Sequence, residues 1–147
     1  MSTRCYIGVE KENKSVEYIY CHHDGYPAGV GKTLVENYTS PESIQKLMAL
    51  GDLSSLGPEP VDNPESWNHT WCLHDECEND RRCVSYKGRG DTDCDAHDAE
   101  SLEEFCEYFQ NSDVDFAYIN REGKWYLIGY NPKSKEITLK NIYYKKR

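Results

Sequence analysis

The sequence lacks an apolar run long enough to cross a membrane, and it lacks a leader-like apolar segment near its first residue. A membrane-spanning helix needs about 20 largely apolar residues. A secretory leader needs an apolar stretch of about 7 to 15 residues before a cleavage site. Neither pattern occurs in the 147 residues. We therefore expect a soluble protein of the reducing cytoplasm, without a membrane partner.

Positive charge is also scarce. The chain carries 17 Lys and Arg against 26 Asp and Glu, which gives a formal net charge of -9. Because nucleic-acid phosphates demand clustered cations, we predict no nucleic-acid partner. The acidic residues concentrate in 75–104, while the tail 140–147 is basic. The acidic stretch is suited to a basic protein surface, unless it is only a solvated face that keeps the protein soluble.

No internal repeat or low-complexity segment divides the chain, whose length is that of one domain. With 37% hydrophobic residues, 12 Tyr and 3 Trp, it has enough apolar material for a core. We predict a single domain over residues 1–147, with a Cys-rich loop insertion at about 67–97.

Alternating apolar residues predict strands near both ends of the sequence. Residues 4–10 and 16–21 form a β-hairpin, whose second strand is apolar on both faces and therefore central in a sheet. Residues 114–144 form a three-stranded meander. Weaker patterns indicate short strands at 70–74 and 82–87.

Capping residues mark two helices. Ser40 starts one that Gly51 ends, and Ser101 starts another with a capping box. A shorter helix is predicted over 30–37, and the Gly-, Pro- and Ser-rich residues 52–64 are predicted to be a connecting loop. Together these elements predict an α+β fold: an about five-stranded, mainly antiparallel sheet with two to three helices packed on one face.

The stretch Tyr18–Thr33, YIYCHHDGYPAGVGKT, combines a strand, a glycine-rich turn and a helix start. Its last residues invite comparison with the phosphate-binding loop GxxxxGK[ST], but Tyr26 stands where the first glycine would have to be. The β-hairpin ahead of it also differs from the parallel sheet of nucleotide hydrolases. The spacing and the topology therefore both argue against such an enzyme.

A glycine-rich turn that opens a helix still offers backbone amides and the positive end of a helix dipole to an anion. Lys32 adds a charge, and Tyr26 can stack on a base or ring. We predict a ligand-binding corner for an anion or nucleotide, made of Asp24, Tyr26, Gly29, Gly31, Lys32 and Thr33. The alternative is that the glycines only meet backbone constraints and that Tyr26 packs on the sheet.

His22, His23 and Asp24 are alternative residues for a metal centre or an acid–base pair. Adjacent strand residues face opposite sides, so both histidines reach one site only if the chain turns there. Otherwise one histidine hydrogen-bonds within the fold, and Asp24 caps the turn or the following helix.

The Cys- and His-rich segment is the second candidate site. A structural zinc takes four thiolate or imidazole ligands and would order a segment that is poor in apolar residues. The pool of candidate ligands is Cys72, His74, Cys77, Cys83, Cys94 and His97. Their spacings match no standard zinc knuckle because CxxC pairs are missing. Independent thiols and a nucleophilic Cys–His pair therefore stay open as alternatives.

Several stretches together resemble a family of small phage and prophage proteins. They are Ser2–Arg4, Ile7–Val9, Ile19–His22, Asp24–Pro27, Gly29–Lys32, Ala49–Gly57, Ala99–Phe105 and Trp125–Tyr126. The resemblance covers most of the chain except its Cys-rich middle, and it implies a viral origin and the cytoplasm of an infected host cell. Family members commonly carry tryptophan at the position of His23, which argues against a catalytic role for it.

Small phage proteins often bind a host defence protein or its nucleotide messenger. We therefore expect a non-enzymatic accessory protein that inhibits a host defence system, either by sequestering a phosphorylated nucleotide-type ligand at 24–33 or by docking on a host protein. The alternatives are a small metal-dependent hydrolase or nucleotide-processing enzyme using residues 22–24, and a virion or assembly component. The Tyr-rich last strand also offers an edge for a homo-oligomer, unless its tyrosines cover the core.

Overall fold

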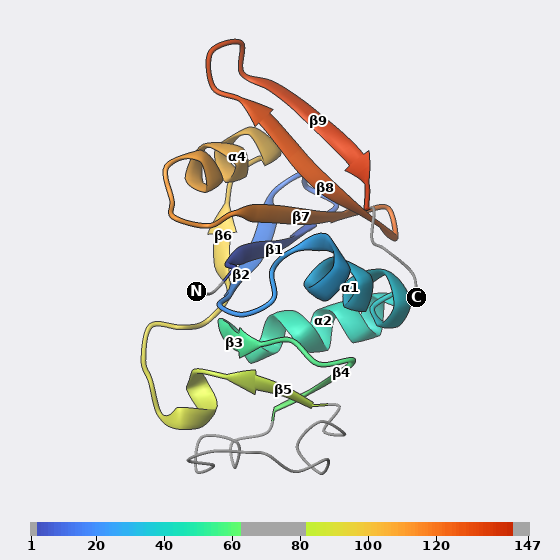
Figure 1. Cartoon of the computed structure of the whole chain (residues 1–147), viewed down its shortest axis with the longest axis vertical. Helices are drawn as coiled ribbons and strands as arrows, with labels where there is room; N and C mark the ends of the chain where they lie inside the picture. Colours follow the sequence, from blue (N-terminus) through green and yellow to red (C-terminus); the bar gives the residue numbers. More distant parts are fainter. Residues whose placement is uncertain (1–2, 63–81, 143–147) are drawn as a thin grey trace.

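The computed structural model describes residues 3–62 and 82–142, which form a curled mixed sheet with three short α-helices (Figure 1). The helices are α1 (Lys32–Asn37), α2 (Pro41–Leu50) and α4 (Leu102–Gln110). A π-helical turn, η1 (Pro27–Gly31), leads into α1, and a 3-10 turn, η3 (Lys87–Arg89), follows the fifth strand. The strands are β1 (Cys5–Glu10), β2 (Val16–Cys21), β3 (Leu53–Ser55), β4 (Glu59–Asp62), β5 (Arg82–Ser85), β6 (His97–Ala99), β7 (Phe116–Arg121), β8 (Lys124–Asn131) and β9 (Glu136–Asn141).

The strand order in the sheet is β4-β5-β3-β2-β1-β7-β8-β9. The remaining strand, β6, lies outside this order and pairs with β2. The pairs β1–β7, β2–β3 and β4–β5 are parallel, and the other pairs are antiparallel. The predicted α+β fold with about five strands is therefore wrong, because the described residues form nine strands and are mostly β. The unexpected strands are short, and short strands carry no clear alternation.

The helices lie on both faces of the sheet, with α1 and α2 on one side and α4 on the other (Figure 1). Alternation along the central strands explains this arrangement. Ile19 and Tyr118 face the core that contains α1 and α2, whereas Tyr18 and Ile119 face a second core that contains Phe105 of α4. The predicted packing of all helices on one face is therefore wrong. Because β2 is apolar on both faces, other elements have to pack against each face.

The predicted loop over 52–64 is also wrong, because it contains β3 and β4. Leu53 is fully buried and lies opposite Cys21 at the end of β2. The Asp52 carboxylate accepts a hydrogen bond of 2.9 Å from the Tyr20 backbone N–H, which lies on the same edge of β2. These contacts come from residues more than 30 positions away, so the Gly, Pro and Ser content of the segment gave no sign of them.

Several local predictions are confirmed. The β1–β2 hairpin and the β7–β8–β9 meander form as expected. Ser40 accepts a hydrogen bond from the Ser43 N–H at the start of α2, and Ser101 accepts one from the Glu104 N–H at the start of α4. The strand expected near 82–87 is β5, while residues 70–74 lie outside the described part of the chain.

The helix predicted over 30–37 forms in two parts, as η1 followed by α1. No helix in the described ranges is long and apolar enough to cross a membrane. Among the described strands, β4 and β9 are the two edge strands of the sheet. The predicted homo-oligomer would form along the β9 edge and remains a prediction.

Candidate functional site

The glycine-rich corner after β2 lines a polar depression of about 430 Å³. The depression contains Asp24, Gly29, Lys32 and Thr33 of the six predicted ligand residues, together with neighbours from α1 and the segment before β4. Gly31 is buried instead, and a Cβ there would meet the Tyr118 ring. The structure thus gathers four of the predicted residues around one hollow.

Three backbone amides of the corner, those of Gly29, Val30 and Lys32, are used inside the corner itself. Asp24 adopts a φ of 58°, which lets its carbonyl accept the Val30 N–H at 2.8 Å. The Gly29 N–H donates to the Tyr26 carbonyl at 2.9 Å, and the Lys32 N–H donates to carbonyls of η1. Since these three donors are satisfied within the fold, they do not serve as anion ligands, and side chains such as Lys32 gain importance.

The side chains around the depression are mixed in charge. Lys32 is exposed and Thr33 is half-buried, but the Asp24 and Glu36 carboxylates lie at the same hollow. The Tyr26 hydroxyl donates to Asp24 at 3.3 Å, and the negative charge of Asp24 raises the pKa of that tyrosine. The predicted ligand set remains a prediction, with Lys32 as its cation.

The two neighbouring histidines do lie close together. Their ring centroids are 4.7 Å apart, and both backbone N–H groups donate to β3, His22 to the Leu53 carbonyl and His23 to the Ser54 carbonyl. The Tyr20 hydroxyl lies 2.6 Å from His22 Nδ1, and burial, then His23 and Arg4, lowers the pKa of His22. Within the described residues, however, no three His, Cys, Asp or Glu side chains gather as metal ligands, and this includes 22–24.

The described members of the proposed zinc pool have separate partners. The Cys83 thiol is buried beside Tyr38, whose hydroxyl is 3.5 Å away, and the Cys94 thiol donates to the Asp91 carbonyl at 3.4 Å. His97 Nε2 lies 3.1 Å from the Asp52 carboxylate. Cys72, His74 and Cys77 lie outside the described residues, so a structural zinc remains a prediction.

The described thiols are poor candidates for a nucleophile. All five, Cys5, Cys21, Cys83, Cys94 and Cys106, are buried. Burial raises the pKa of Cys106 to about 12 and that of Cys5 well above its usual value. A thiol must lose its proton to attack, and these two stay protonated at neutral pH.

Eight carboxylates follow one another along the loop before β6, β6 itself and α4, and all are exposed except the half-buried Glu104. We call them the acidic face; they belong to Asp91, Asp93, Asp95, Asp98, Glu100, Glu103, Glu104 and Glu107. Residues 91–107 contain no Lys or Arg. Among the described residues, Lys87 lies 2.8 Å from Asp95 and Lys11 lies 4.0 Å from Asp98. Lys14 and Arg121 line one pocket with Glu103. The face therefore keeps a large negative surplus.

Tyrosines from the sheet adjoin the acidic face. The Tyr18 ring is at the centre, with ring centroids 5.2 Å from Tyr6, 4.9 Å from Phe105 and 6.2 Å from Tyr108. Alternation places the β1 and β2 tyrosines on the α4 side. Tyr108 is 42% exposed and donates a hydrogen bond of 2.9 Å to Glu104. Aromatic and acidic groups thus meet on one surface.

The chain matches no protein-family model, and it has no significant match among curated proteins or solved structures.

The structure brings together two features that the sequence patterns did not predict. One is the row of tyrosines beside the acidic stretch, which the alternation in β1 and β2 already placed on a common face. The other is Asn120, which continues the inward-facing positions of Phe116 and Tyr118 along β7. A polar residue in an otherwise apolar, inward-facing series was the available signal.

Proposed function

We propose that this chain is a phage-encoded accessory protein that inhibits a host defence system by binding, and that the acidic face docks on a basic surface of a host protein. The observation that carries the proposal is the eight carboxylates of the acidic face beside the tyrosine rings of the sheet. The viral setting comes from the sequence resemblance.

Two physical properties suit this surface to protein docking. A concentrated negative field steers a positively charged partner and speeds the encounter. Tyrosine supplies contact area at a low entropic cost and is common among residues that dominate binding energy. The half-buried rings of Tyr6 and Tyr20 and the exposed ring of Tyr108 provide that area. Charge would then set the approach, and the rings would hold the complex.

Charge reversal on the acidic face is the direct test. We expect Glu100→Lys with Glu107→Lys to lower the association rate with the host partner by roughly an order of magnitude, because the steering field is reversed locally. The partner is first captured from a bacterial host lysate and identified by mass spectrometry. Its binding to purified wild type and variant is then measured by surface plasmon resonance at low and high ionic strength.

The matched control is Glu36→Lys with Glu42→Lys, which changes the net charge equally but lies on α1 and α2. All four glutamates are exposed, so none of the changes disturbs the core. The control should bind like the wild type. Equal losses in both double variants, or binding that ignores ionic strength, would contradict docking through the acidic face.

Capture of a nucleotide is a second mode, and the depression around Lys32 supports it. If this mode operates, Lys32→Ala is expected to weaken nucleotide binding about 10- to 100-fold, because a charge-assisted hydrogen bond to phosphate is lost. Lys46→Ala, an exposed lysine on α2 outside the depression, is the control. Calorimetric titration with cyclic and ADP-ribose-type nucleotides measures both. If no nucleotide binds, and Lys32→Ala with Tyr26→Ala still inhibits the host system, capture is disproved.

A further inference from the structure

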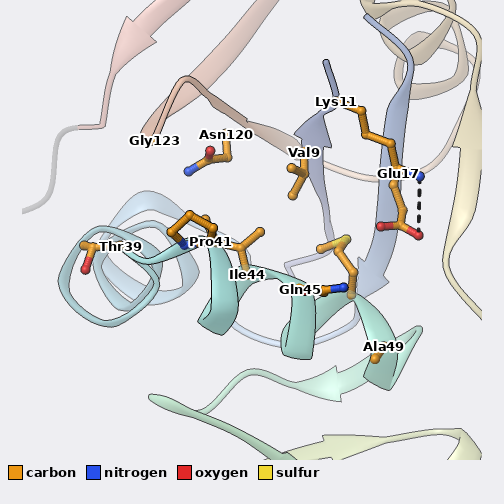
Figure 2. A pocket seen from close by; sticks show the side chains of 11 residues that line it. Val9, Lys11, Glu17, Thr39, Pro41, Ile44, Gln45, Ala49, Asn120 and Gly123 are labelled. Atoms are coloured by element: carbon orange, nitrogen blue, oxygen red, sulfur yellow. Dashed lines mark ion pairs between the residues drawn. The ribbon is translucent and has the colours of Figure 1, made fainter. Parts of the chain in front are cut away.

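A second pocket, of about 550 Å³, lies between α2 and the sheet (Figure 2). It is separate from the corner depression and from the eight carboxylates of the acidic face, since they share no lining residue. Apolar side chains cover much of its wall, among them Val9 from β1 with Pro41, Ile44 and Met48 from α2. Its volume lies within the range of about 300 to 1,000 Å³ that is typical of small-molecule sites.

One buried polar group belongs to this pocket and has no partner. Asn120 is only 5% exposed, and its Nδ2 makes no hydrogen bond to any residue in the described ranges. In Figure 2 its side chain extends from β7 toward the start of α2, near Pro41. Native proteins pair almost all buried amide groups, because an unpaired one costs desolvation energy. An acceptor supplied by a ligand would pair this donor.

The pocket lining contains one cation and one anion, Lys11 and Glu17, and Lys11 also lies 4.0 Å from Asp98 outside the lining. Lys11 Nζ lies 4.0 Å from Glu17 Oε2, and Figure 2 marks this ion pair at one side of the pocket. Gln45, exposed on α2, contributes an uncharged amide to the lining. A ligand with a net charge would lose hydration on entering and find no uncompensated opposite charge. The lining therefore favours an uncharged ligand.

We propose that this pocket binds an uncharged small molecule with an apolar body and a carbonyl oxygen, which accepts a hydrogen bond from Asn120 Nδ2. The apolar body lies against the α2 side chains, and the carbonyl faces β7. Ligand binding explains why the fold keeps Asn120 Nδ2 buried and unpaired. Functional sites often lower the stability of the folded protein in this way.

The test uses a panel of neutral amides as probes: acetanilide, N-benzylacetamide and N-cyclohexylacetamide. Each is titrated into the ¹⁵N-labelled full chain and followed by two-dimensional NMR. The side-chain amide signals of Asn120 are assigned by their loss in Asn120→Leu. We expect saturable shifts of these signals and of Val9, Ile44 and Met48 for at least one probe. Phenylacetate and benzylamine, charged relatives of these probes, should bind more weakly.

Three variants make the result decisive. Asn120→Leu should weaken probe binding about 3- to 10-fold, because one neutral hydrogen bond is lost. Gln45→Trp should block the pocket, whereas Lys46→Trp, its exposed neighbour on α2 outside the lining, should leave binding intact. The proposal is overturned if no probe binds saturably, if Asn120→Leu binds as tightly as wild type, or if the two tryptophan variants behave alike. The Gln45 comparison decides the matter if Asn120→Leu does not fold.

Discussion

Replacing Gly51 by alanine is expected to lower the free energy of unfolding by about 2 to 6 kcal/mol. Gly51 ends α2 with φ 74° and ψ -157°, a conformation that is essentially restricted to glycine. An added Cβ would also collide with the backbone carbonyl of Cys94. That carbonyl accepts the Asp52 N–H at 2.8 Å, so neither backbone segment can move away without losing this bond.

Urea unfolding monitored by circular dichroism measures the loss. Gly90→Ala is the matched control, because Gly90 also has a positive φ, 99°, but an added Cβ would meet nothing within 4 Å. It should cost only about 1 kcal/mol, the usual difference for a left-handed position. If the two variants lose equal stability, the close approach of Gly51 to Cys94 is not what makes glycine necessary.

Because of the position of Gly51, we expect its replacement to disturb the neighbouring strands as well as the end of α2. The next residue, Asp52, accepts the Tyr20 N–H of β2 and lies 3.1 Å from His97 of β6. One carboxylate thus joins the end of α2 to two strands of the sheet. Displacing Gly51 would strain both contacts, so amide hydrogen exchange at Tyr20 should accelerate in Gly51→Ala.

Phe105→Ala is expected to cost about 3 to 5 kcal/mol, the range for deleting a fully buried phenylalanine side chain. Phe105 is 0% exposed, and its ring packs against Tyr6 and Tyr18 with centroid distances of 6.1 and 4.9 Å. It also lies against Gly8, where an added Cβ would approach the ring to 3.1 Å. A nine-residue helix is marginal by itself, so α4 depends on this packing.

Thermal and urea unfolding give the stability change, and hydrogen exchange in α4 shows whether this helix opens first. Phe109→Ala is the control: it makes the same substitution one turn later on the same helix, but Phe109 is only partly buried. A smaller loss is expected there. An equal or larger loss in Phe109→Ala would mean that Phe105 is not the main contact between α4 and the sheet.

The same variant connects the fold with the proposed function. Four of the carboxylates on the acidic face lie on or just before α4: Glu100, Glu103, Glu104 and Glu107. If Phe105→Ala loosens α4 while the rest of the chain remains folded, docking should weaken although no acidic residue has changed. The reversal pair Glu100→Lys with Glu107→Lys tests the charges themselves, so the two experiments separate position from charge.

The ligand-binding corner shows which features of a site a sequence motif can predict and which it cannot. Asp24, Gly29, Lys32 and Thr33 do line one depression, as expected from a turn that opens a helix. The Val30 N–H, however, is not free to bind an anion, because the Asp24 backbone carbonyl accepts it. This bond depends on a φ of 58° at an aspartate, which the sequence motif does not encode.

The sequence by itself determined the features that depend on neighbours a few positions apart. The β1–β2 hairpin, the β7–β9 meander, and the caps at Ser40 and Ser101 arise from alternation and from hydrogen bonds over three residues. The tertiary structure decided the rest. The three-residue strands β3 and β6 exist because β2 offers them a shared edge, and both sheet faces are covered because both are apolar. The pocket beside Asn120 likewise forms only where α2, β1 and β7 meet, since no local pattern describes a space enclosed by distant segments.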